Sequence, residues 1–127
     1  MSSNENNNFF FGRIRSVTFT VVGVVTLLKE HHAAWVHSLV TALALFAGFV
    51  FSITSIEWMF LILAISMVWV AEALNTSIEY VCDVSSPEFH PLIKKSKDVA
   101  AGAVLLATMG GTAIGLIIFI PYVTSAL

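Results

Sequence analysis

Three long apolar runs limit what this chain can fold into more than any other feature. They cover residues 33–51, 58–71 and 99–120. The first and last are close to the ~20 residues that a helix needs to cross a bilayer, and the helical pattern of the second continues to residue 83. Only 11% of the residues are charged, whereas a soluble domain carries about 25%. We therefore predict an all-α integral membrane protein, built as a single helical-bundle domain with three transmembrane helices.

The segments outside these runs complete the predicted domain. The first residues are polar and Asn-rich and lack the pattern of a secretory signal, so they are predicted to form a flexible tail. The next segment mixes apolar, basic and hydroxyl residues, which favours an amphipathic helix in the membrane interface; part of a fourth span is the alternative. The predicted bounds are 1–8 for the tail, 9–31 for the interfacial helix, and 33–51, 57–83 and 98–120 for the three spans.

Turn and helix-breaking residues separate the predicted spans. Residues 52–55 form a short turn, the Ser-Ser-Pro sequence at 85–87 breaks the second span, and Pro121 ends the third. Every basic residue lies before the first span or between the second and third: Arg13, Arg15, Lys29, Lys94, Lys95 and Lys97. With three spans these regions share one side, and the positive-inside rule predicts a cytoplasmic N-terminus.

Two classes of function are excluded by what the sequence lacks. No basic stripe interleaved with aromatic residues occurs, which argues against nucleic-acid binding. Cys82 is the one cysteine, so the chain has no internal disulfide framework and no cysteine metal motif. We interpret Cys82 as a packing residue.

Four polar residues form a stripe near the end of the second span. Glu72, Asn75, Glu79 and Asp83 are spaced i, i+3, i+7 and i+11, which places them on one helical face. At about 1.5 Å per residue, Glu72 lies ~21 Å along the helix from Trp58 and Glu79 ~31 Å, so the first is inside the hydrocarbon and the second is at its boundary. A carboxylate at that depth costs at least ~2.5 kcal/mol on insertion scales and indicates a functional site.

Residues 72–83 also resemble the signature of the small prokaryotic diacylglycerol kinase family, which includes undecaprenol kinases. Every defined position of that signature is filled: Glu72, Asn75, Thr76, Ile78, Glu79 and Asp83. A second family element follows at Glu88, Phe89 and His90, and a third at Lys97 and Asp98. The resemblance runs from about Arg13 to Ile120, nearly the whole chain.

The resemblance implies a homotrimer of three-span subunits in the bacterial inner membrane, each with an N-terminal surface helix. It implies transfer of the terminal phosphate of ATP to a lipid hydroxyl, with Mg²⁺ as cofactor. Glu72 would be the general base and Glu79 a magnesium ligand, supported by Asn75 and Asp83. The nucleotide would be bound by Arg13, Glu88, His90, Lys97 and Asp98.

The segment before the first span departs from the family pattern. Residues 29–37 keep an acid, Glu30, and the final histidine, His37, but lack the Asn and Arg between them. Glu30 is the available second magnesium ligand, and His31 stands at the expected register. The spacing of Ser16, Gly23, Glu30 and His37 is more similar to the undecaprenol kinase branch.

We predict an ATP- and magnesium-dependent lipid kinase acting on diacylglycerol or undecaprenol at the cytoplasmic face. A non-enzymatic ion or proton pathway is the alternative, although no ionisable residue lies between Trp58 and Ala71 to continue it across the bilayer. A third possibility is a degenerate family member that has lost activity and is kept for regulation. Gly111 and Gly115 are interpreted as a helix-packing pair.

Overall fold

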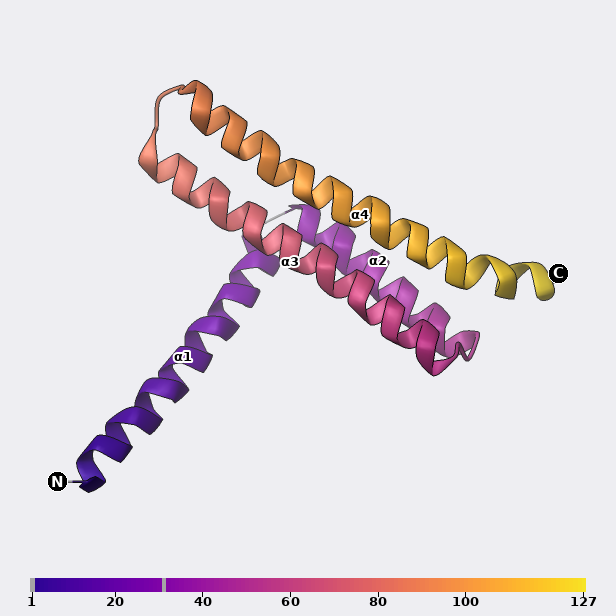
Figure 1. The fold of residues 1–127 in the computed structure, drawn as a ribbon, viewed down its shortest axis with the longest axis horizontal. Coiled ribbons are helices and arrows are strands. Elements are labelled where there is room, and N and C mark those ends of the chain that lie inside the picture. Colours follow the sequence, from indigo (N-terminus) through magenta and orange to yellow (C-terminus); the bar gives the residue numbers. More distant parts are fainter. Residues whose placement is uncertain (1, 31) are drawn as a thin grey trace.

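All regular structure in the described residues is helical. The computed structural model describes residues 2–30 and 32–127, and its side chains over 12–30 and 34–127. Four helices follow one another along the chain (Figure 1): α1 (Ser2–Glu30), α2 (His32–Val50), α3 (Ser55–Ser85) and α4 (Pro91–Ser125).

The helices α3 and α4 form the main antiparallel pair, and α2 packs beside α3 (Figure 1). Each of α3 and α4 is long and apolar enough to cross a bilayer. Gly12–Glu30 and Ala34–Val50 qualify together as a third candidate, but they are bent by 102° relative to each other. The chain therefore has the predicted membrane architecture, with α1 projecting away from the other three helices.

Helices α1, α3 and α4 are longer than the predicted segments, whereas α2 has the predicted length. Described residues of the predicted tail, 2–8, belong to α1. Helix α4 begins at Pro91 rather than near residue 98, because Pro91 is suited to the first turn and the His90 Nδ1 accepts a hydrogen bond from the Leu92 N–H at 3.2 Å. The basic segment before the third apolar run is therefore helical and not an irregular connection.

Pro121 does not end the last helix, contrary to the prediction. It lies inside α4, which continues to Ser125. Proline supplies no N–H to the carbonyl four residues before it, yet the helix continues for one more turn. Its carbonyl also accepts a hydrogen bond from the Ser125 hydroxyl at 2.8 Å.

The turn between α2 and α3 is tight. Gly48 lies so close to the Trp58 ring that an added Cβ would come within 2.7 Å of it, so this position needs glycine. Ser52 adopts φ = 51°, in the left-handed region that non-glycine residues rarely occupy. Thr54 then caps α3, with reciprocal hydrogen bonds between Thr54 and Glu57.

The apolar core lies at this turn end of the bundle. Ile53, Leu61 and Ile118 are its buried centre, with Phe51 and Phe119 among the side chains packed against it. Here the Tyr122 hydroxyl of α4 donates a hydrogen bond to Glu57 Oε2 of α3 at 2.7 Å. The strongest packing is therefore at the opposite end of α3 from the polar stripe.

We expect Tyr122→Phe to lower stability and leave the chemistry of the polar stripe unchanged. The substitution removes from Glu57 a hydrogen bond that joins α3 to α4, and hydrogen bonds to a charged group are stronger than neutral ones. Thermal unfolding in detergent should show a lower midpoint. Thr124→Val is the matched control, because its hydroxyl bonds only within its own helix among the described residues. Equal shifts in both variants would contradict a specific tie between α3 and α4.

Candidate active site

The polar stripe of α3 changes from buried to exposed along the helix. Glu72 is 3% exposed and Asn75 is also buried. Glu79 is half-buried and Asp83 is exposed. The stripe thus leads from a buried carboxylate to the surface. It reaches the surface at the end of α3 that lies beside the basic residues of α4.

Asn75 is hydrogen-bonded to Glu79, the next carboxylate along the stripe. Its Nδ2 donates a hydrogen bond to Glu79 Oε1 at 3.3 Å, which confirms that these residues share a face. In the described part of the chain, the buried Asn75 Oδ1 and Thr76 Oγ1 have no hydrogen-bond partner. Buried polar atoms are costly when left unpaired. The site therefore contains two oxygen atoms whose hydrogen-bonding ability is not used within the described chain.

Glu72 is paired across the helix interface with His37 of α2. The His37 Nε2 lies 3.6 Å from Glu72 Oε2, and the two side chains are 16% and 4% exposed. The His37 ring meets the Trp69 ring edge-on, with centroids 6.2 Å apart. The sequence identified His37 as a position shared with the family but predicted no role for it. The feature that could have pointed to a role is a histidine inside an otherwise apolar run.

Glu30, the last residue of α1, also reaches α3. Its Oε2 accepts a hydrogen bond from the hydroxyl of Tyr80, the residue after Glu79. This contact brings the end of α1 to the same part of α3 as the predicted magnesium ligand. Tyr80 was missed by the sequence analysis, since nothing in its neighbourhood pointed to α1. His31, the alternative ligand, lies outside the described residues.

The start of α4 lies beside the end of α3. Lys97 Nζ donates to Asp83 Oδ1 at 2.8 Å, and Lys94 Nζ donates to Asp98 Oδ2 at 2.6 Å within α4. His90 is the N-cap of α4. Glu88 is exposed, and its carbonyl accepts a hydrogen bond from the Ser86 hydroxyl at 2.8 Å. The nucleotide-binding residues predicted in this segment therefore gather around one exposed, charged end of the bundle.

Arg13 is the predicted site residue that lies apart from the others along α1. Seventeen residues before Glu30 in a continuous helix, it is ~26 Å along the axis from the end of α1. Its assignment to the nucleotide stays a prediction.

The residues present fit magnesium but not a metal site built only from protein. Across the described residues, no three His, Cys, Asp or Glu side chains lie close enough together to hold a metal ion. Mg²⁺ usually takes one or two carboxylates and completes its shell with phosphate and water. Glu79, oriented by Asn75, and Glu30 beside Tyr80 could supply those carboxylates.

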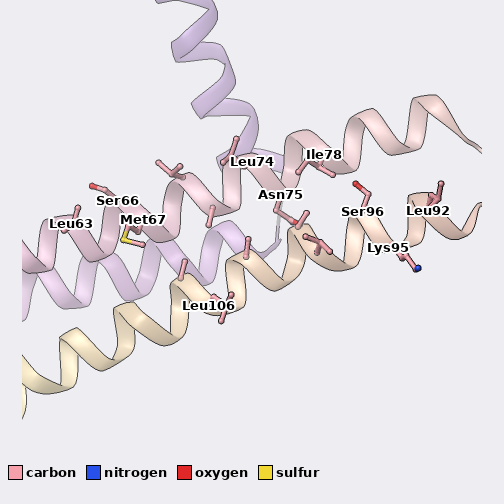
Figure 2. Close-up of a pocket in the computed structure, with 16 residues that line it drawn as sticks. Leu63, Ser66, Met67, Leu74, Asn75, Ile78, Leu92, Lys95, Ser96 and Leu106 are labelled. Atoms are coloured by element: carbon pink, nitrogen blue, oxygen red, sulfur yellow. The ribbon is translucent and has the colours of Figure 1, made fainter.

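A groove of about 1050 Å³ runs between α3 and α4 beside the stripe. Most of its lining is apolar, and Asn75, Lys95 and Ser96 lie toward the charged end of the two helices (Figure 2). A smaller cavity of about 590 Å³ lies between α2, α3 and α4 and includes His37, Gly111 and Gly115. A Cβ added at Gly111 would lie 3.4 Å from Val68 of α3, whereas one added at Gly115 would meet nothing within 4 Å, so the expected packing pair is only half formed within the described chain.

Comparison with known proteins gives consistent matches along the chain. Residues 18–119 match the family described as prokaryotic diacylglycerol kinase. Undecaprenol kinase of Bacillus subtilis is 35% identical over 118 residues, which is 93% of each chain. Diacylglycerol kinase of Helicobacter pylori is 44% identical over 59 residues, 46% of each chain. Diacylglycerol kinase of Escherichia coli is 30% identical over 94 residues, 74% of this chain and 65% of the relative.

Proposed function

This chain belongs to the prokaryotic diacylglycerol kinase family and is a lipid kinase, and from this premise we propose that it transfers the terminal phosphate of ATP to a membrane-lipid hydroxyl at the cytoplasmic face. The observation that carries the proposal is the carboxylate of Glu72, buried within a candidate membrane span. A base at that depth can meet a lipid hydroxyl but not a nucleophile dissolved in water. The stripe beyond it leads to the end where a soluble nucleotide can bind.

The proposed reaction is an in-line phosphoryl transfer. Glu72 accepts the proton of the lipid hydroxyl while the lipid oxygen forms a bond to the γ-phosphorus and the bond to the leaving ADP oxygen breaks. Glu79 and Glu30 would hold magnesium, which when bound supplies charge neutralisation on the phosphates. Asn75 orients Glu79 through its 3.3 Å hydrogen bond.

The charged end of α3 and α4 would bind the nucleotide. Lys97, in contact with Asp83, offers a cation to phosphate, and Asp98, Glu88 and His90 lie in the same segment. The basic residues of α4 lie at this end, which supports a cytoplasmic orientation in the inner membrane. ATP is then on the side of the membrane where this site opens.

The acceptor is proposed to be a lipid with long apolar chains, undecaprenol or diacylglycerol. The similarity to the Bacillus subtilis undecaprenol kinase over 93% of both chains favours undecaprenol. The groove between α3 and α4 fits such a molecule, because its walls are mainly apolar and Asn75 lies beside its polar end.

We also propose that the chain acts as a homotrimer. Large apolar side chains are exposed along α2, α3 and α4, including Phe46, Leu63 and Leu106. Some would face lipid, and others would be covered by neighbouring copies.

The deciding experiment is labelled-phosphate transfer from ATP by the purified protein. Undecaprenol, diacylglycerol, ceramide and monoacylglycerol are offered separately in mixed micelles, with and without Mg²⁺. We expect transfer that requires Mg²⁺ and is fastest to undecaprenol. Absence of transfer to all four lipids by the folded oligomer would support the degenerate, regulatory alternative. Faster transfer to diacylglycerol would correct only the proposed acceptor.

Lys97→Ala is expected to raise the KM for ATP about tenfold, because it removes a cation that would make a charge-assisted hydrogen bond to phosphate. The KM for lipid should change much less, because Lys97 lies at the nucleotide end. Asp98→Ala should act in the same direction. Initial rates with each substrate varied in turn provide the measurement.

Asp83→Asn is the control for the Lys97 substitution. It weakens the contact at 2.8 Å but leaves the Lys97 charge in place. Its effect on the KM for ATP should therefore be smaller than that of Lys97→Ala. Equal increases in the KM values for ATP and lipid in Lys97→Ala would indicate a folding defect and remove Lys97 from the nucleotide site.

A further inference from the structure

His37 of α2 reaches the carboxylate that the proposed reaction uses as its base. The distance of 3.6 Å between His37 Nε2 and Glu72 Oε2 is within ion-pair range and slightly longer than a hydrogen bond. Both side chains are largely shielded from solvent, at 16% and 4% exposure. A charge interaction at this distance is therefore screened far less than it would be on the surface.

A second pair of side chains, Trp69 and Thr41, lies beside His37 and Glu72 and restricts the position of the imidazole. Trp69 lies three residues before Glu72 on α3, and Thr41 lies four residues after His37 on α2, so each is one helical turn from its partner. Trp69 Nε1 donates a hydrogen bond to Thr41 Oγ1 at 3.1 Å, and its ring meets the His37 ring at 67°. The four side chains form one contact between the two helices, which restricts how the imidazole can turn.

Other ionisable groups lie farther from Glu72 in the described part of the chain. Helix α4 carries no acidic residue, basic residue or histidine after Asp98. Glu79 is seven residues further along α3, or ~10 Å along its axis. Glu30 of α1 is bonded to Tyr80, eight residues beyond Glu72 and ~12 Å along the axis. His37 is thus the described ionisable side chain that faces Glu72 directly.

The buried carboxylate needs such a partner. A polar group buried in an apolar environment is disfavoured unless another polar group pairs with it. The imidazole of His37 lies against one carboxylate oxygen of Glu72 and leaves the other for the substrate.

We propose that His37 is a positioning residue for the kinase reaction, which holds one oxygen of Glu72 and so directs the other at the lipid hydroxyl. This inference rests on the proposed function. In the transfer, the proton moves from the lipid hydroxyl to Glu72, the new bond forms from the lipid oxygen to phosphorus, and ADP leaves. His37 takes up neither the proton nor the phosphate and contacts neither substrate.

Two substitutions of His37 separate this role from simple packing. The amide nitrogen of Gln can reach the position of Nε2 and donate a hydrogen bond to Glu72, whereas that of Asn reaches only the position of Nδ1. We expect His37→Asn to lower kcat at least tenfold and His37→Gln to lower it clearly less. Both should leave the KM for ATP within about twofold of wild type. Equal kcat losses in the two variants would overturn the proposal.

A double-mutant cycle gives the second readout. Glu72→Asp keeps a carboxylate but draws it away from His37, so His37→Asn should cost much less in that background than in the wild type. Additive losses would show that His37 does not act through Glu72. Ser38→Ala, a half-buried neighbour on α2, is the matched control and should keep wild-type kcat.

The same assays distinguish the two possible failures. If the wild-type protein phosphorylates no lipid, the proposed function fails. If the wild type is active but His37→Asn keeps wild-type kcat, only the role of His37 fails. Oligomer size and thermal midpoint are measured for each variant, so that a loss from misfolding appears as a change in those values.

Discussion

Glu72→Gln is expected to lower kcat by ~10²- to 10⁴-fold, the contribution usual for a positioned general base. The amide keeps the shape of the side chain, but it cannot accept the proton of the lipid hydroxyl. Because Glu72 is only 3% exposed, bulk water cannot easily replace it as the base. Labelled-phosphate transfer at saturating ATP and lipid measures the loss, and turnover within a few fold of wild type would remove Glu72 as the base.

Glu57→Gln is the matched control, with the same chemical change on the same helix. Glu57 lies at the other end of α3, where it accepts hydrogen bonds from Thr54 and Tyr122. We expect this variant to lose some thermal stability and to keep kcat. Oligomer size should be unchanged in Glu72→Gln, since the amide fills the same volume. A comparable loss of kcat in both variants would indicate that any carboxylate of α3 supports the fold and that neither is a specific base.

Glu79→Gln and Glu30→Gln are expected to raise the magnesium concentration needed for half-maximal activity by about tenfold or more. Loss of one of two carboxylate ligands leaves the ion held by the remaining carboxylate, phosphate and water. Manganese should partly restore both variants, because it accepts the same oxygen ligands and binds a given site at least as tightly as magnesium in most cases. The KM for lipid should stay near its wild-type value. Titration of activity against each metal ion gives the measurement.

Tyr80→Phe is the control for the Glu30 substitution. It removes the hydrogen bond to Glu30 but leaves the carboxylate available to a metal ion. Its magnesium requirement should therefore rise much less than that of Glu30→Gln. The assignment of Glu30 is falsified if Glu30→Gln has wild-type metal dependence while Glu79→Gln does not. His31 would then be the next candidate, and its imidazole would favour a softer ion than magnesium.

The sequence by itself determined the membrane architecture and the composition of the polar stripe. Apolar runs near 20 residues can satisfy their backbone only as helices in a bilayer, so their presence predicts the class of fold directly. The spacing of Glu72, Asn75 and Glu79 follows from helical periodicity alone, and the 3.3 Å hydrogen bond between Asn75 and Glu79 confirms their shared face. The Ser-Ser-Pro sequence at 85–87 was also predicted to break this helix, and α3 ends at Ser85, two residues beyond the predicted bound of 83.

Only the tertiary structure decided which side chains meet across helices. The pairing of His37 with Glu72 depends on how α2 is rotated and shifted against α3, and the contact of Glu30 with Tyr80 depends on the 102° bend between α1 and α2. Periodicity gives the face of one helix but not its partner or its register. Those are set by packing, such as Gly48 against Trp58 at the turn, and packing is a property of two surfaces that no single segment contains.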